Sequence, residues 1–212
     1  MGVKISIADE FYDRCCREYT LRYRDPGKFA QTSLGRISSY QIEGVGHVTL
    51  ARTSALFVTR EGCVFAPDGK DAPILMVDRV KKPGSDTLTI NIVKSQLSPI
   101  TYRQFEKLEE SFEKLEDADA PEVWYSAELI RGSVAKKAGA EELAGLLEEY
   151  MDAYLRIVEF AEKCDPAVKA EKNAAFARGL LEKGGPAADK IRKTLGEDGA
   201  KDFFDTVVFP QR

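Results

Sequence analysis

The chain contains little histidine and little cysteine, and both shortages restrict the chemistry that it can carry. Its one histidine, His47, cannot build a histidine-rich metal site. Its four cysteines form neither a CxxC pair nor a zinc-ligand spacing, so we expect reduced thiols. We therefore predict no bound metal.

Long apolar runs, a strong excess of one charge and a leader pattern are also lacking. No stretch approaches the roughly 20 apolar residues that a membrane-spanning helix needs, and the N-terminus has no basic segment followed by an apolar one. The net charge of −4 argues against broad binding to nucleic acid or to an anionic membrane, but it leaves room for a local basic patch. We therefore expect a cytoplasmic protein with no nucleic-acid or membrane partner.

Two sequence signatures of common enzyme classes are missing as well. The glycines of Gly44-Val-Gly46 and Gly184-Gly185-Pro186 do not have the spacing of a phosphate-binding or dinucleotide-binding loop, and turns explain them. No serine occupies a nucleophile elbow. The chain thus lacks the usual marks of a nucleotide-binding or serine-hydrolase site.

Short segments rich in β-branched and aromatic residues occupy positions 34 to 97. Turn residues separate these segments and no helical pattern lies between them, which predicts an antiparallel meander rather than βαβ units. The predicted strands include residues 36–42, 47–52, 55–59 and 63–66, followed by a hairpin over residues 71–97.

Helical spacing of apolar residues occurs on both sides of this region. The predicted helices cover residues 7–23, 105–115, 141–163, 166–183, 190–195 and 199–207. This order of elements predicts one α+β domain over residues 1–212, in which helices flank a central antiparallel sheet.

The predicted hairpin carries an aspartate in an apolar setting. Side chains alternate along a strand, so Asp78 shares a face with Ile74, Met76 and Val80. Such a carboxyl group must be hydrogen-bonded, paired or protonated at unusually high pH, because desolvation disfavours its charged form. Asp78 is therefore either a structural aspartate or a proton donor or substrate-binding group.

Two further polar residues leave similar alternatives open. His47 lies between Val45 and Val48 in a predicted strand, where it is either a hydrogen-bonded wall residue or a titrating catalyst. Arg131 follows an aromatic and apolar run that begins at Trp124. It is either a surface charge or the partner of a substrate carboxylate.

Three segments carry a family resemblance when they are taken together. The first runs from Phe65-Ala-Pro through Asp78 to Leu97-Ser98-Pro99, and the second covers residues 191–210. The third runs from Trp124 to Arg131. In their order and spacing, over roughly residues 40 to 210, they resemble the ferredoxin-dependent bilin reductases. This is the family of phycocyanobilin:ferredoxin oxidoreductase, with red chlorophyll catabolite reductase as a distant relative.

The resemblance implies an α/β/α sandwich that holds a linear tetrapyrrole (a bilin such as biliverdin) between the sheet and the C-terminal helices. It also implies reduction without a bound cofactor, by electrons from ferredoxin and protons from the protein. Asp78 matches the catalytic aspartate of the family, and Glu61 falls near the histidine that partners it in many members. His47 matches a different sheet histidine, and Gly184-Gly185 falls near an aspartate that some members carry.

These correspondences lead to a bilin-reductase-like oxidoreductase as the first hypothesis. In it Asp78 donates protons, Glu61 or His47 assists, and Arg131 or another basic side chain pairs with a propionate. His47 and Asn91 are further substrate-binding candidates. The alternatives are a non-enzymatic carrier of a tetrapyrrole or other hydrophobic ligand, and a pure interaction module. The expected contacts with an acidic ferredoxin are Arg79, Lys81, Lys82, Lys190, Arg192 and Lys193.

Overall fold

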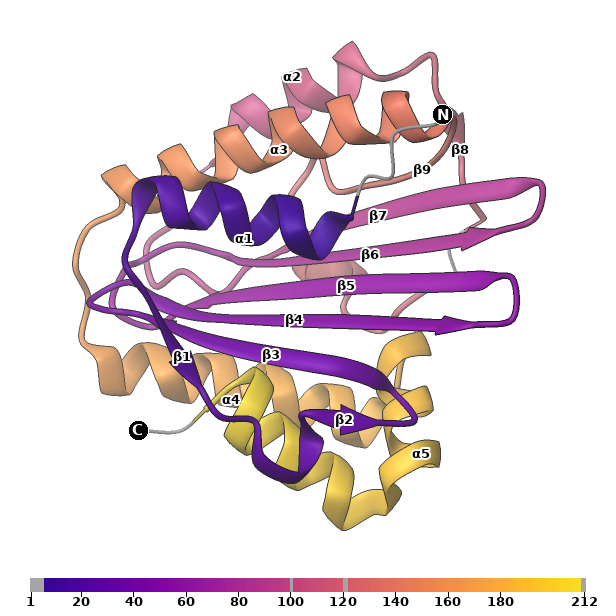
Figure 1. Cartoon of the computed structure of the whole chain (residues 1–212). Helices are drawn as coiled ribbons and strands as arrows, with labels where there is room; N and C mark the ends of the chain where they lie inside the picture. Colours follow the sequence, from indigo (N-terminus) through magenta and orange to yellow (C-terminus); the bar gives the residue numbers. More distant parts are fainter. Residues whose placement is uncertain (1–5, 100, 120–121, 211–212) are drawn as a thin grey trace.

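A nine-stranded antiparallel sheet runs through the middle of the molecule, with helices on both of its faces (Figure 1). The computed structural model describes residues 6–99, 101–119 and 122–210. The strand order is β1-β3-β4-β5-β6-β7-β9-β8, with β2 beside β3. The strands are β1 Leu21–Arg24, β2 Gln31–Thr32, β3 Gly35–Ile42, β4 Gly46–Ala55, β5 Val58–Pro67, β6 Ile74–Lys82, β7 Ser85–Val93, β8 Glu116–Asp117 and β9 Val134–Lys137. The predicted sandwich with a central antiparallel sheet is confirmed.

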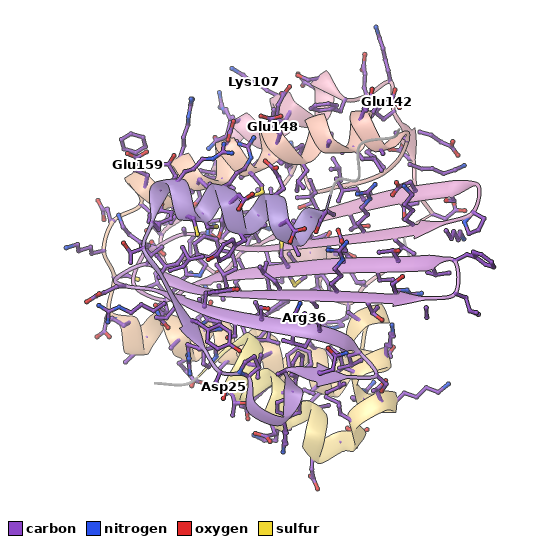
Figure 2. The ribbon with its side chains drawn as sticks, viewed as in Figure 1. Asp25, Arg36, Lys107, Glu142, Glu148 and Glu159 are labelled. Carbon is purple, nitrogen blue, oxygen red and sulfur yellow. The ribbon has the colours of Figure 1, made fainter. Side chains whose placement is uncertain are left out.

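Helices from both halves of the chain cover this sheet. Helices α1, α2 and α3 lie on one face, while α4, α5 and the π-helix η3 lie on the other (Figure 1). Charged side chains such as Lys107 and Glu142 project outward from the first layer (Figure 2). The helices are α1 Ile7–Glu18, η1 Gly27–Phe29, α2 Arg103–Ser111, η2 Ser126–Glu128, α3 Ala140–Phe160, α4 Pro166–Lys183, α5 Pro186–Phe203 and η3 Phe204–Val208. Within the described ranges, no helix combines the length and the apolar character that crossing a membrane requires.

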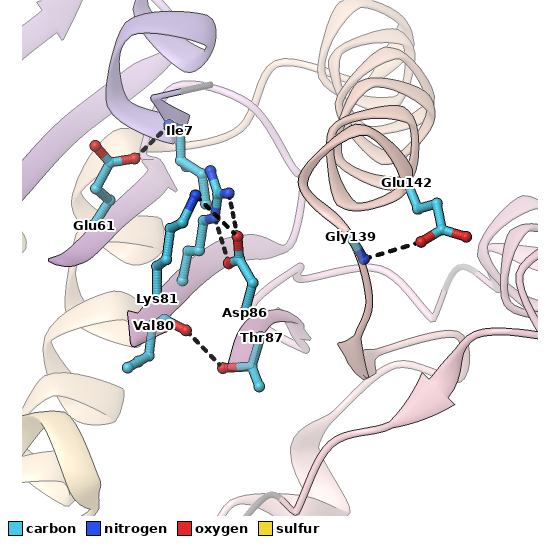
Figure 3. Close-up of polar contacts among 9 residues, drawn as sticks. Ile7, Glu61, Val80, Lys81, Asp86, Thr87, Gly139 and Glu142 are labelled. Carbon is cyan, nitrogen blue, oxygen red and sulfur yellow. Dashed lines mark hydrogen bonds and ion pairs between the residues drawn. The ribbon is translucent and has the colours of Figure 1, made fainter. Parts of the chain in front are cut away.

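Local signals set the starts of the long helices. The carboxylate of Asp165 accepts a hydrogen bond from Ala167 N at 2.9 Å, and Pro166 occupies the first position of α4. At the start of α3, Glu142 Oε2 accepts a hydrogen bond from Gly139 N at 2.9 Å (Figure 3). Both contacts satisfy amide groups that the helix itself leaves without partners.

Side-chain alternation divides the core into two clusters, one on each face of the sheet. On the α1–α3 face, the ring of Phe65 packs edge-to-face against Phe11 and Tyr154, with centroids 6.3 and 5.4 Å away. On the α4–α5 face, Ile74 of β6 joins Phe176 of α4 and the aromatic residues of the chain's end. The sheet therefore contributes to two separate cores, which is why its central strands are mostly apolar.

The structure differs from the sequence prediction at several boundaries. Residues 55–59 and 63–66 do not form separate strands, because β4 and β5 are longer and meet at the two-residue turn Leu56–Phe57. The N-terminal helix ends at Glu18, and β1 follows it because it pairs with β3. The break expected between the two C-terminal helices is present inside α5 at Gly196, whose φ of 75° and ψ of 172° are not helical. The strand bounds and the end of the N-terminal helix depend on pairing with distant segments, and a local sequence pattern cannot reveal such pairing.

Candidate functional site

The α4–α5 face of the sheet is only partly covered. Across β4 to β7, the residues Ala51, Gly62, Asp78 and Thr89 lie side by side, and each is half-buried or exposed. Positions next to this row toward the β4–β5 turn are also half-buried or exposed, whereas Thr49, Ala66 and Ile74 on the same face are buried. We name this region the open patch, and its members are Ala51, Thr53, Arg60, Gly62, Val64, Met76, Asp78, Val80, Thr87, Thr89 and Asn91.

Asp78 lies in the middle of the open patch, on β6. Solvent reaches its carboxyl group, but the surrounding sheet and the C-terminal layer remove part of its hydration. This desolvation raises the pKa of Asp78, against the opposing effect of the positive charges of Arg60 and Lys190. The carboxyl group therefore holds its proton to higher pH than an ordinary aspartate, as the apolar neighbours in the sequence suggested.

Three side chains from outside β6 interact electrostatically with this carboxyl group. Arg60 comes from β5 and Lys190 from α5, and both charges act on Asp78. The buried Tyr125 comes from the segment before η2, and its pKa is raised by burial and then by the charge of Asp78. The site thus combines one carboxyl group, two cations and a phenol.

The sheet surface beside Asp78 carries no side chain on β5, because the residue that pairs with Asp78 there is Gly62. A Cβ atom at position 62 would lie 3.5 Å from Val77 O and 3.7 Å from Asp78 Oδ1, which are ordinary contact distances. The absence of a side chain here is therefore not forced by packing. It leaves space directly next to the carboxyl group.

Asn91 shares the open patch with Asp78. It pairs with Met76 across the β6–β7 ladder, while Asp78 pairs with Thr89. Asn91 and Asp78 are thus diagonal neighbours on one face, which places them about 7–8 Å apart by strand geometry. The structure brings these two predicted site residues together.

Glu61 lies on the opposite face of the sheet, and the structure does not bring it to Asp78. Its Oε2 accepts a hydrogen bond of 2.6 Å from Ile7 N at the start of α1 (Figure 3). Its Oε1 lies 3.0 Å from Nε of Arg52, and its side chain is buried. These contacts fix α1 to the sheet, because a carboxylate at a helix N-terminus satisfies free amide groups and interacts favourably with the helix dipole.

His47 lies on the same face as Asp78 but outside the open patch. It is on β4, two strands from Asp78, and it pairs with Ala66 of β5, four residues beyond Gly62. By strand geometry the two residues are roughly 16 Å apart. The Nε2 of His47 lies 2.8 Å from Val207 O and 2.9 Å from Ser39 Oγ. Because a carbonyl oxygen only accepts, Nε2 carries the proton. Burial lowers the pKa of His47 to about 4, so the ring is neutral at physiological pH. The geometry is that of a hydrogen-bonded wall residue.

The predicted cations are distributed differently from the expectation. Arg131 is exposed in the turn after Ile130 and is not part of the open patch. Arg79 is buried on the α1–α3 face and donates to Asp86 at 2.8 and 2.5 Å, so it is not available for docking a partner. Arg60, which the sequence reasoning missed, lies beside the site. Arg60 is two residues from Gly62, so the sequence could show that both share a face of the strand. Only the strand register shows that this face lies next to Asp78.

Elsewhere in the described chain, neither the larger surface pocket nor any side-chain cluster offers a second candidate site for a proton donor or a metal ion. A pocket of about 440 Å³ lies at the edge of the sheet, lined by residues that include Arg22, Glu43 and Cys164, and none of the predicted site residues lines it. Within residues 6–99, 101–119 and 122–210, no group of three or more histidine, cysteine or acidic side chains is arranged to hold a metal ion.

Comparison with known proteins adds one finding. No family model and no curated protein matches the chain. Among solved structures, it is similar to phytochromobilin synthase from tomato in complex with biliverdin, with a TM-score of 0.75. The match covers 93% of this chain and 80% of the other, at 12% sequence identity. The chain has the bilin reductase fold. At this identity the likeness concerns the fold alone, and the residues of the site must carry any functional argument.

Proposed function

We propose that the open patch binds a bilin and that the chain reduces it, with electrons from a ferredoxin-like donor and a proton from Asp78. The observation that carries this proposal is a carboxyl group with a raised pKa at the centre of a sheet face that the C-terminal helices cover only in part. The fold supports it, because the similar structure of phytochromobilin synthase is a complex with biliverdin. In this proposal residues 1–212 act as one domain, since the patch lies between the sheet and the C-terminal helices.

The patch offers a bilin both apolar and polar contacts. Val64, Met76 and Val80 provide a floor on which flat pyrrole rings can lie. Lys190 and Arg60 supply positive charge for the propionate groups, which makes them better placed than Arg131 for that role. A bilin over these residues would exclude water from Asp78 and favour its neutral form further.

Proton delivery follows from the state of Asp78. Reduction of a bilin double bond adds two electrons from the donor and two protons. The pyrrole nitrogens and lactam oxygens of a bilin are within the reach of a neutral carboxylic acid on the floor, which can protonate the reduced ligand. Because solvent reaches Asp78, water can return the proton after each transfer.

The second candidate is a bilin carrier that does not turn over. It is favoured by the lack of a second carboxyl or imidazole group beside Asp78 among the described residues, since Glu61 is on the other face and His47 is remote. A carrier would use the same floor and the same cations. The two functions therefore predict the same binding but different reactivity.

A biliverdin titration followed by anaerobic addition of reduced ferredoxin tests the proposal. We expect a change in the visible bands on binding, then turnover that weakens with salt, because screening acts within about 10 Å at 0.1 M. Asp78→Asn keeps the shape but removes the transferable proton, so we expect retained binding and turnover about 100-fold lower. Glu61→Gln on the neighbouring strand is the matched control and should retain turnover.

The outcomes separate the hypotheses. Binding without turnover in the wild-type chain would support the carrier. Unchanged bands on titration would contradict both functions and favour an interaction module. Wild-type turnover in Asp78→Asn would remove Asp78 from the mechanism.

A further inference from the structure

The turn between β4 and β5 presents two large apolar side chains to solvent. Leu56 is 97% exposed and Phe57 is 81% exposed, and they form the whole loop because Ala55 pairs with Val58. The turn lies at the end of a long hairpin, at the same end of the sheet as the β6–β7 turn (Figure 1). Both side chains therefore stand at a projecting tip.

The backbone of this tip is not the one that its sequence favours. Leu56 has a φ of 53°, and among the described residues it is the one non-glycine with a positive φ. Two-residue hairpin turns normally place glycine, asparagine or aspartate at such a position. A large aliphatic residue here works against folding and gains no burial, and such local conflicts are expected where a residue serves another purpose.

Positive charge surrounds the tip, although the chain as a whole has a net charge of −4. Lys81 is paired with Thr59 in the β5–β6 ladder, and Lys82 is exposed at the end of β6. Lys81 Nζ lies 3.9 Å from Asp86 (Figure 3), whose carboxylate is mainly bound by Arg79. Over residues 52–61 and 79–86, Glu61 pairs with Arg52 and Asp86 with Arg79, which leaves Arg60, Lys81 and Lys82 as the excess positive charge.

We propose that this tip docks on an anionic lipid surface, with Leu56 and Phe57 inserted among the lipids and with Lys81 and Lys82 on the headgroups. An apolar pair flanked by basic side chains is the combination that binds peripheral proteins to anionic membranes. A protein partner fits less well, because a stable interface buries about 800 Å² per partner and the tip is convex and two residues wide. The expectation of no membrane partner rested on the charge of the whole chain, whereas the tip is locally basic.

This docking is independent of the proposed function, and its test uses the full chain without any ligand. Sedimentation with vesicles of phosphatidylcholine, with and without phosphatidylglycerol, measures partition at low and physiological salt. We expect binding only to the anionic vesicles. The double variant Leu56→Ser/Phe57→Ser should bind these vesicles at least about tenfold more weakly. In Lys81→Gln/Lys82→Gln, vesicle affinity at low salt should fall about fivefold for each lysine removed.

Phe160 supplies the matched control. It is 80% exposed at the end of α3, next to Glu159 (Figure 2), so it is equally apolar but lies away from the tip, where Lys70 and Glu159 make the surroundings mixed in charge. Phe160→Ser should leave vesicle binding unchanged. Leu56→Gly addresses folding separately, because glycine relieves the positive φ and should raise the melting temperature while weakening vesicle binding.

Three results would overturn the proposal. They are wild-type partition that does not depend on the anionic lipid, wild-type partition that survives in Leu56→Ser/Phe57→Ser, and an equal loss in Phe160→Ser. Concentration-dependent dimerisation that the double serine variant abolishes, without any vesicle binding, would instead identify the tip as a contact between two copies of the chain. Binding of an acidic protein in place of vesicles would identify a protein interface.

Discussion

The two faces of the sheet are built by the same strands but are covered to different extents. On the α1–α3 face, Cys63 and Val77 pair with each other and are buried under helices. One residue along each strand, Gly62 and Asp78 also pair, but they lie in the open patch of the other face. Both faces therefore carry a core, but only the α4–α5 face leaves part of the sheet uncovered, and the proposed binding site lies there.

The polar residues of the two faces differ in the same way. On the packed face, the carboxylate of Glu61 is bound by Ile7 N, and the guanidinium of Arg79 is bound by Asp86. On the open face, Asp78 has cations nearby but is partly desolvated, and its pKa is raised. Buried charges that are fully paired serve structure, whereas a carboxyl group with a raised pKa is the kind of group that often occurs at functional sites.

The largest expected effect comes from removing a large side chain from the packed face. Phe65→Ala should lower the free energy of unfolding by about 3–5 kcal/mol, because the rings of Phe11 and Tyr154 cannot close the cavity. Its neighbour Val64 points to the open patch, so Val64→Ala should cost about 1 kcal/mol or less. Urea denaturation of both variants measures the contrast, and equal losses would mean that the two faces are equally packed.

The next effect concerns the space beside Asp78. Gly62→Val adds a side chain that suits a strand and whose Cβ atom meets only ordinary contacts, so the fold should be retained. The added bulk should weaken bilin binding about tenfold or more, since overfilling a packed site typically costs 1–3 kcal/mol. Gly62→Ala should have a smaller effect in the same titration. Full bilin affinity in Gly62→Val would show that the ligand does not lie on this row of the sheet.

A smaller effect is expected from Glu61, on the packed side of the same strand. Glu61→Gln removes the negative charge at the start of α1 and the ion pair with Arg52. We expect the free energy of unfolding to fall by about 1 kcal/mol. Bilin binding should not change, because the residue faces away from the open patch. A loss of turnover without a loss of stability would restore Glu61 as a catalytic partner.

The smallest effect is a pH-dependent change in stability at Asp78. Its pKa is higher in the folded chain than the ordinary value of 3.8, so the folded state binds more protons between these two values and stability falls as pH rises through that window. Asp78→Asn removes this loss, and the variant should melt at a higher temperature than the wild-type chain at neutral pH. The difference should vanish as the pH falls below about 4.

Asp71 supplies a control of opposite sign for this measurement. Burial acts to raise its pKa, but hydrogen bonds from Ser98 and Leu97 outweigh burial and lower it. Its stabilising contribution is therefore present above the unfolded pKa and is lost as the pH falls through the folded one. Asp71→Asn should melt at a lower temperature than the wild-type chain at neutral pH. A lower melting temperature for Asp78→Asn as well would identify Asp78 as a structural aspartate.

The sequence by itself determined the class of the fold and the position of its most informative residue. Alternation along β6 showed that Asp78 shares a face with Ile74 and Met76, and spacing of three and four predicted the long helices. These are local properties, since side-chain direction in a strand or helix repeats over two to four residues. The apolar neighbours of Asp78 were enough to predict that its carboxyl group would resist ionisation.

Only the tertiary structure decided which side chains meet Asp78. Glu61 precedes Gly62 by one residue, and that single step moves it to the opposite face, where it binds the start of α1. Lys190 reaches the site from a helix more than a hundred residues along the chain, which no local pattern can show. Strand register and helix docking depend on contacts between distant segments, and those contacts determined where the sheet was left uncovered.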